Sequence, residues 1–218
     1  MEYVKLNNGV EMPILGFGVY QIPKEETKEC VLNAIKVGYR LIDTAQSYFN
    51  ESEVGEAISE CGVPREELFI TTKVWIDNYG YDKCKASILE SLKKLKTDYI
   101  DLVLLHQPFS DYYGAYRALE DLYHEGKIRA IGVSNFYPDR LADICLFGRK
   151  VIPAVNQVET NPFNQQVKAQ ENMEKYGVHI EAWAPFGEGK SGMFENVTLK
   201  KIGEKYGKSV AQVILRWL

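Results

Sequence analysis

The sequence predicts an α/β protein built around a parallel sheet. Short apolar runs rich in β-branched residues alternate with amphipathic stretches of helical period along the 218 residues. Runs such as "IDLVLL" at residues 100–105 are apolar almost throughout, which is typical of strands covered on both faces. Because repeated strand–helix units form parallel sheets, these observations define the fold class.

The expected elements follow one another with short connections. A hairpin opens the chain, with a type I′ turn expected at Asn8–Gly9. Seven strand candidates lie at residues 14–18, 40–45, 68–74, 99–106, 128–135, 153–159 and 179–185. Helical stretches lie at 24–38, 51–62, 81–96, 112–127, 137–148 and 165–177, and residues 198–218 predict a broken helix. No composition shift or flexible linker divides the chain, so residues 1–218 are expected to form a single domain.

The composition argues against several classes of partner. Hydrophobic residues make up 45% and charged residues 26%, as in ordinary globular domains, and the formal net charge is −4. This charge gives no general attraction to nucleic acid or anionic membranes, and no apolar run reaches the length of a bilayer span. The N-terminus lacks the pattern of a signal peptide, and the four cysteines form no CxxC pair. We therefore expect a cytoplasmic protein with reduced thiols and no metal site.

Two architectures are compatible with seven strand–helix units, a doubly wound open sheet and a (β/α)₈ barrel. A dinucleotide-binding open sheet requires G-x-G-x-x-G after its first strand. Gly16-Phe17-Gly18 supplies only the first half, and Gln21 stands where the third glycine belongs. This departure weakens the open-sheet alternative.

Polar side chains recur at the carboxyl ends of the predicted strands, which favours the barrel. These residues are Asp43, Lys73, His106, Ser134, Asn135, Gln157 and Trp183, and Tyr48 lies in the loop after Asp43. Each one alone fits an ordinary structural role, such as a cap, an ion pair or a packed core residue. Barrel enzymes place their chemistry at this end of the strands, so the whole set predicts an active site.

Four of these residues form a coherent chemical group. A tyrosine has a reference pKa of about 10, and a nearby ammonium such as Lys73 lowers it. Asp43 keeps the lysine charged, and His106 can donate a hydrogen bond to a polarised oxygen. With Tyr48 they suit the addition of a proton to a carbonyl oxygen while hydride reaches the carbon, with no need for a metal.

The motifs around these residues resemble the aldo-keto reductases. "GYRLIDTAQSYFNESEVG" at residues 38–55 is similar to the first signature of that family. "TTKVW", "LLHQP", "GVSNF", "NQVETNPF" and "AWAPFG" follow in the family's order, and the resemblance extends from about residue 4 to Leu218. Within the family, the bacterial small-aldehyde and 2,5-diketo-gluconate reductases look most similar.

The resemblance implies a monomeric barrel that reduces small aldehydes or ketones with NADPH. It makes Tyr48 the general acid, whose pKa Lys73 lowers, with Asp43 paired to the lysine and His106 orienting the carbonyl. The cofactor would be bound by Gly18, Asp43, Ser134, Asn135, Gln157, Trp183, Phe186 and Gly187. Of these, Trp183 would stack on the nicotinamide, and Ser134, Asn135 and Gln157 would bind its carboxamide. The substrate pocket would be lined by Tyr20, Trp75, Phe109 and Phe136.

The end of the sequence departs from the family pattern. Family members continue into an eighth strand and helix that carry a P-K-S/T segment and an arginine for the 2′-phosphate, whereas this sequence ends in a helix at Leu218. We therefore expect a barrel without its eighth strand and helix, in a C-terminally incomplete chain, and the choice between NADP and NAD stays open. Two alternatives also stay open, a cofactor-binding redox-sensing subunit on the same fold and an inactive truncated product.

One further motif suggests a different enzyme class. Ala184, followed by Gly189-Lys190-Ser191, gives a relaxed form of the phosphate-binding loop of ATPases. Such a loop requires a helix to begin at the lysine, but no helical period appears before about Thr198, and Pro185 removes a backbone donor. The stretch is better interpreted as the end of the seventh strand and the loop after it.

Overall fold

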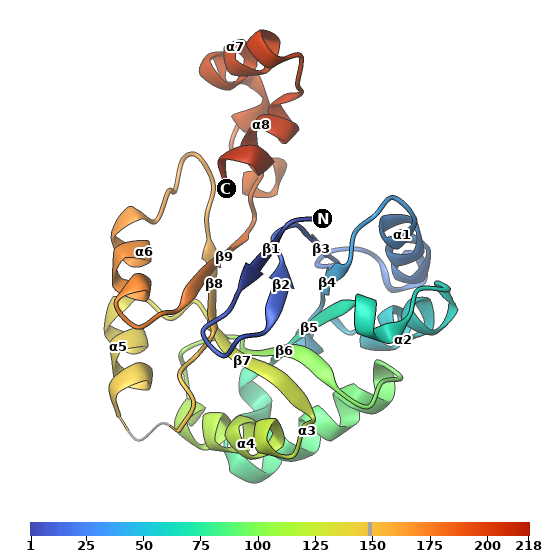
Figure 1. The fold of residues 1–218 in the computed structure, drawn as a ribbon, viewed down its shortest axis with the longest axis vertical. Helices are drawn as coiled ribbons and strands as arrows, with labels where there is room; N and C mark the ends of the chain where they lie inside the picture. The colour runs from blue at the N-terminus through green and yellow to red at the C-terminus, as the bar shows by residue number, and fades with distance from the viewer. Residues whose placement is uncertain (148–149) are drawn as a thin grey trace.

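The computed structural model of the chain describes residues 1–147 and 150–218. Its centre is a parallel sheet whose seven strands pair in chain order (Figure 1). The strands are β3 (Gly16–Gly18), β4 (Leu41–Asp43), β5 (Phe69–Val74), β6 (Ile100–Leu105), β7 (Ile128–Ser134), β8 (Val155–Glu159) and β9 (His179–Trp183). All seven strand predictions are confirmed. The consecutive order excludes a doubly wound sheet, in which the strand order reverses.

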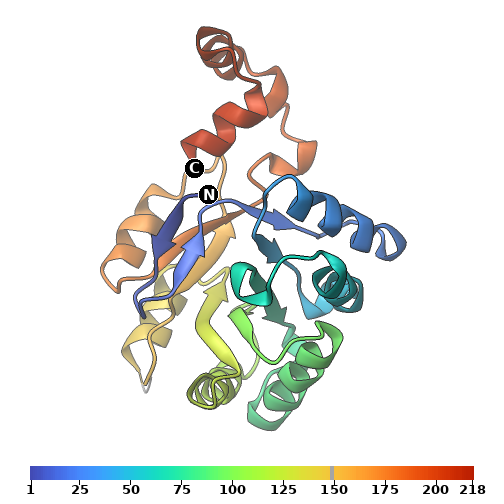
Figure 2. The same ribbon diagram turned by 45° about the vertical axis from the view of Figure 1, so that its right-hand side comes forward.

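Helices cover the outer face of the curled sheet (Figures 1 and 2). They are α1 (Lys24–Lys36), α2 (Glu51–Glu60), α3 (Tyr81–Lys94), α4 (Tyr112–His124), α5 (Pro138–Leu146) and α6 (Val167–Glu174). The end predicted for the fifth helix, Gly148, lies outside the described residues. Within the described ranges no ladder joins β3 to β9, so the predicted barrel without an eighth strand is confirmed there. No helix in these ranges is both long and apolar enough to cross a membrane.

The chain after β9 forms a separate projection from the barrel (Figures 1 and 2). Two short 3₁₀ turns, η4 (Gly187–Gly189) and η5 (Met193–Glu195), precede α7 (Val197–Tyr206) and α8 (Val210–Trp217). The predicted broken helix is confirmed, because Gly207 is left-handed and Ser209 caps α8. No helix begins at Lys190, so the phosphate-binding loop of an ATPase is absent from this segment.

The opening hairpin is present, but its predicted turn type is wrong. β1 (Tyr3–Lys5) and β2 (Glu11–Pro13) pair antiparallel, and Leu6 N donates to Val10 O at 2.8 Å. Gly9 has a φ of 87°, whereas Asn8 has no positive φ, so a type I′ turn is excluded. The loop is a type I turn followed by a left-handed glycine, and the hairpin buries Leu6 and Met12 in a cluster with residues of the sheet.

Gly55 marks the point where α2 packs most closely on the end of α3. A Cβ at this position would lie 2.1 Å from Lys94 O and 2.8 Å from the Cα of Leu95, both of which are backbone atoms. Replacement by alanine requires the two helices to separate.

We expect Gly55→Ala to lower the free energy of unfolding by about 1–3 kcal/mol, because the added methyl overlaps a rigid backbone. Denaturant unfolding measures the change. Ser59→Ala on the exposed side of the same helix is the matched control and should stay within about 0.5 kcal/mol. Equal stability of the two variants would contradict the close packing of α2 on α3.

Candidate active site

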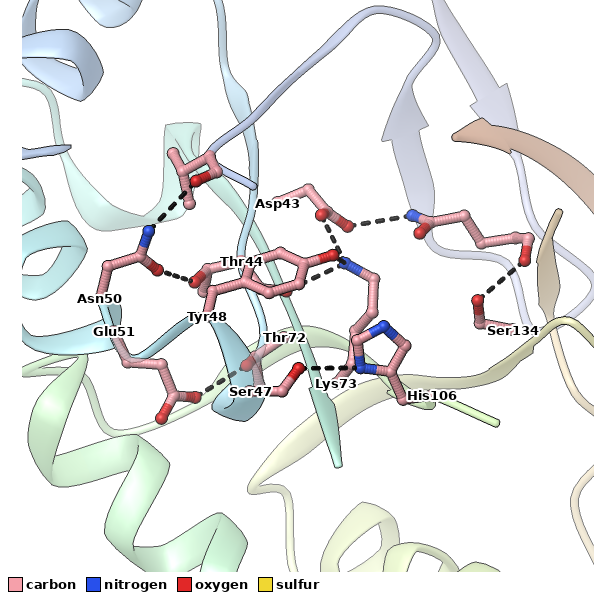
Figure 3. A network of polar contacts seen from close by, with 12 residues as sticks. Asp43, Thr44, Ser47, Tyr48, Asn50, Glu51, Thr72, Lys73, His106 and Ser134 are labelled. Carbon is pink, nitrogen blue, oxygen red and sulfur yellow. Dashed lines mark hydrogen bonds and ion pairs between the residues drawn. The ribbon is translucent and has the colours of Figure 1, made fainter. Parts of the chain in front are cut away.

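The strand register brings the predicted polar residues to one end of the sheet. Gly18 pairs with Asp43, Ser134 with Gln157, and Glu159 with Trp183. Each of these pairs lies at or near the carboxyl end of its strands, so their side chains and the loops that follow share one rim. Figure 3 shows the polar network at this rim.

Lys73 is at the centre of the network. Its side chain is 1% exposed, and its Nζ donates to Asp43 Oδ1 at 2.5 Å, to Thr44 O at 3.0 Å and to Tyr48 OH at 3.3 Å (Figure 3). A buried ammonium is stable only when oxygen atoms replace its water, and these three contacts do so. The predicted pairing of Lys73 with Asp43 and Tyr48 is therefore present in the structure.

A short loop between β4 and α2 positions Tyr48. Residues Gln46–Tyr48 form the 3₁₀ turn η1, and Phe49 leaves it with a left-handed backbone. Asn50 is buried and holds the end of the loop, because its Nδ2 donates to Val19 O at 3.1 Å and its Oδ1 accepts from Thr44 Oγ1 at 2.8 Å.

Gln46 anchors the start of the loop from the other side. Its Oε1 accepts from Trp75 N at 3.0 Å and from Asn78 Nδ2 at 2.8 Å, and its Nε2 donates to Ser87 Oγ at 3.1 Å. Sequence reasoning assigned no role to Gln46 or Asn50. The sequence signal for such a role was that the two amide residues flank Tyr48 in one short loop. Amide side chains that become buried in a loop require hydrogen-bond partners and can therefore fix the loop.

Burial and charge act on Tyr48 in opposite directions. Burial raises the pKa of its hydroxyl above 10.0, while the charge of Lys73 lowers it, and burial has the larger effect. The lysine thus acts in the predicted direction, but the net pKa shift of Tyr48 is upward. For Lys73, burial lowers the pKa, but Asp43 and Tyr48 together raise it above 10.5, so the lysine is charged at neutral pH.

His106 follows β6 and lies beside the tyrosine. Its ring packs edge-on against Tyr48 at 5.8 Å and against Trp75 at 5.1 Å between centroids. Burial, assisted by the charge of Lys73, lowers the pKa of His106 to about 3. The imidazole is therefore neutral at physiological pH, and its Nδ1 lies 3.4 Å from Ser47 Oγ (Figure 3).

The amide and hydroxyl residues predicted to bind a cofactor form one connected group. Trp183 Nε1 donates to Asn135 Oδ1 at 2.9 Å, and Asn135 Nδ2 donates to Ser134 Oγ at 3.2 Å. Ser134 Oγ donates to Gln157 O at 2.9 Å, and Gln157 Nε2 donates to Asp43 Oδ2 at 2.9 Å. The group is thereby joined to the Asp43–Lys73 pair.

Three other predicted cofactor positions are less closely connected to this group. A Cβ on Gly18 would meet no atom within 4 Å, so packing does not require a glycine at the end of β3. Phe186 belongs to the apolar cluster of the C-terminal projection and packs on Phe194 at 5.7 Å between centroids. Gly187 is left-handed, and a Cβ there would lie 2.5 Å from Ser191 Oγ, so its role in this structure is conformational.

The predicted pocket aromatics fall into two groups. Tyr20 lies 4.9 Å from the Tyr48 ring centroid and is 58% exposed, Trp75 packs on His106, and Phe109 is 59% exposed. Phe136 is fully buried and packs edge-on against Tyr112 at 5.4 Å. The structure therefore places Phe136 in the core rather than on an open wall of the site.

Comparisons with known sequences give a consistent family assignment. A family model described as the aldo/keto reductase family matches residues 14–218. Glyoxal reductase from Bacillus subtilis (strain 168) is 50% identical over 216 residues, which cover 98% of this chain and 77% of the relative. Methylglyoxal reductase DkgA from Escherichia coli (strain K12) is 40% identical over 217 residues, which cover 98% of this chain and 78% of the relative.

Solved structures share the same fold over nearly the whole chain. An aldo/keto reductase from Brucella melitensis superposes with a TM-score of 0.95 at 43% identity, covering 99% of this chain and 83% of that chain. The Bombyx mori aldo-keto reductase AKR2E4, in complex with NADP, has a TM-score of 0.94 at 36% identity, covering 100% of this chain and 80% of that chain.

We expect Asn50→Ala to loosen the loop that carries Tyr48. The change leaves Val19 O and Thr44 Oγ1 without their buried partner, which lowers the free energy of unfolding by about 1–3 kcal/mol. Hydrogen exchange of the backbone amides at residues 44–50 should also become faster.

Phe49→Ala is the matched control, because Phe49 is 81% exposed. Its backbone is left-handed, and phenylalanine and alanine tolerate that conformation equally poorly. It should change stability by no more than about 0.5 kcal/mol. Unchanged exchange in Asn50→Ala would show that this residue does not hold the loop.

Proposed function

Since the chain belongs to the aldo/keto reductase family, we propose that it uses NADPH to reduce small aldehydes and ketones to alcohols, with Tyr48 as the proton donor. Family membership makes the protein an oxidoreductase. The class of small carbonyl substrate is supported by the relatives named glyoxal reductase and methylglyoxal reductase DkgA. The choice of NADPH is supported by the Bombyx mori structure in complex with NADP.

The residues at the rim are chemically suited to a nicotinamide ring. The indole of Trp183 lies beside the amide and hydroxyl groups of Asn135, Ser134 and Gln157, so an aromatic surface adjoins hydrogen-bonding groups. This donor set fits a planar ring that carries a carboxamide. When bound, NADPH supplies hydride to the carbonyl carbon, and these four residues would hold its nicotinamide end.

His106 would orient and polarise the carbonyl group of the substrate. With a pKa of about 3, its imidazole is neutral and can carry a hydrogen on one ring nitrogen only. Ser47 lies at Nδ1, so Nε2 is the nitrogen that remains for the substrate, and we assign the hydrogen to it. A neutral donor stabilises the developing negative charge on oxygen without competing with Lys73 as a second cation.

Tyr48 would complete the reduction. As the carbonyl carbon is reduced, the electron pair of the C=O bond moves to oxygen, which takes the hydroxyl proton of Tyr48. The phenolate left behind is 3.3 Å from Lys73 Nζ, and the ammonium stabilises its charge. Because burial raises the pKa of Tyr48, the residue is protonated and ready to donate at neutral pH.

The contact of Lys73 with both Asp43 and Tyr48 is the observation that carries this proposal. It supplies an acid and a stabilising cation for the conjugate base within one buried group. The direct test is NADPH oxidation with methylglyoxal and with an aromatic aldehyde. Cofactor binding without turnover of either carbonyl would overturn the proposal in favour of a redox-sensing subunit.

Tyr48→Phe should reduce kcat for carbonyl reduction by about 10²–10⁴-fold, because it removes the proton donor while the contacts of Lys73 with Asp43 and Thr44 remain. Fluorescence titration should show NADPH affinity within a few-fold of the wild type. Tyr206→Phe, which changes an exposed tyrosine on α7, is the matched control and should retain full activity. A fully active Tyr48→Phe would show that another group supplies the proton.

A further inference from the structure

Glu181 is a carboxyl group inside the barrel that the proposed reaction leaves without a role. It lies in the middle of β9, and its Oε2 is shielded from solvent although the residue as a whole keeps some exposure. This oxygen has no hydrogen-bond partner among the described residues. An unpartnered buried carboxylate oxygen costs free energy, so its presence next to an active site requires an explanation.

The neighbours of Glu181 connect it directly to the catalytic group. Gln157 on β8 pairs with it in the strand register, so the two side chains are neighbours on the same face of the sheet. The same Gln157 amide donates to Asp43 Oδ2 at 2.9 Å, and Asp43 in turn accepts from Lys73. Glu181 is therefore the register neighbour of Gln157, whose hydrogen bond to Asp43 leads to the Asp43–Lys73 pair.

The charged groups that face Glu181 come from two strands. Asp43 on β4 repels its negative charge, and Lys73 on β5 attracts it. Helix α6 packs against β9, and its charged side chains are exposed. These are Lys168, Glu171 and Glu174. The charge of Glu181 is therefore opposed by the carboxylate of Asp43 and favoured by the ammonium of Lys73. That ammonium already contacts Asp43 and Tyr48.

This environment favours the protonated acid. Burial first, and then the charge of Asp43, raises the pKa of Glu181 from 4.5 to about 7. The ionisation of Glu181 therefore changes the charge balance around Lys73 near neutral pH.

We infer that Glu181 is a positioning residue whose carboxyl group, acting through Gln157 and Asp43, sets the proton affinity of Tyr48. This inference rests on the proposed role of Tyr48 as proton donor. When Glu181 ionises, the added negative charge opposes the phenolate and keeps Tyr48 protonated to higher pH. When it is neutral, Lys73 acts on Tyr48 with less opposition and the phenolate is easier to form.

The test is the ionisation of Tyr48 in ligand-free protein, measured from the ¹³Cζ resonance of labelled tyrosine and assigned with Tyr48→Phe. In the wild type the resonance should show a small step near pH 7, as Glu181 ionises. Glu181→Gln keeps the shape of the protonated acid but removes its charge. The step should disappear in this variant, and the pKa of Tyr48 should fall by about half a unit or more.

Thermal unfolding provides a second measurement that needs no cofactor. The pKa of Glu181 is raised in the folded protein, so the wild type loses stability relative to Glu181→Gln as pH rises from 4.5 to about 7. The difference in Tm between the two should therefore be larger at pH 8 than at pH 5. Glu171→Gln, on the exposed side of α6, is the matched control and should follow the wild type at every pH.

The outcomes separate this inference from the proposed function. A Tyr48 resonance that titrates identically in Glu181→Gln and the wild type would overturn the inference, even if the Tm difference shows that Glu181 is a buried acid. If Glu181→Gln does not fold, the wild-type resonance alone decides, and the absence of a step near pH 7 would overturn the inference. Failure of the proposed function would appear separately, as no carbonyl reduction by wild-type protein that binds NADPH.

Discussion

The side chain of Lys73 is 1% exposed, and the surrounding site is organised by the need to compensate the charge of its ammonium group. Asp43 on the neighbouring strand supplies the counter-charge, and the carbonyl of Thr44 supplies a second acceptor. Tyr48 supplies the third, which fixes where its loop must lie. A lysine in a fully buried strand would be costly without these contacts, so the same interactions serve both the stability of the barrel and the proposed proton transfer.

Much of the fold could be predicted because it depends on local patterns. Strands such as β6 are buried along their whole length, and an apolar run that is covered on both faces is visible in a single sequence. The polar residues at the rim, such as Asp43, Lys73 and His106, could also be predicted from the sequence, because strand ends in a parallel barrel meet at one edge. The family motifs then added roles that spacing alone does not provide.

The remaining features depend on burial, strand register and packing in the folded protein, which cannot be read from the sequence. The direction of the Tyr48 pKa shift required the depth of its burial as well as the charge of Lys73. Glu181 looked like an ordinary residue of a strand, and only the register with Gln157 places it beside the catalytic group. Phe136 follows the rim residue Asn135, yet its side chain packs into the core. The type I′ turn predicted at Asn8–Gly9 is wrong for a simpler reason. The hairpin loop is one residue longer than a type I′ loop, and such a loop requires only one left-handed residue, Gly9.

The proposed proton transfer depends on the buried charge of Lys73, which stabilises the phenolate of Tyr48. The most direct measurement is the pKa of Tyr48 in ligand-free Lys73→Met protein, followed by the tyrosine ¹³Cζ resonance and compared with the wild type. Removal of the cation leaves burial as the dominant influence, so the pKa of Tyr48 should rise further above its already raised wild-type value. An unchanged or lower pKa in a folded Lys73→Met variant would show that the ammonium does not stabilise the phenolate.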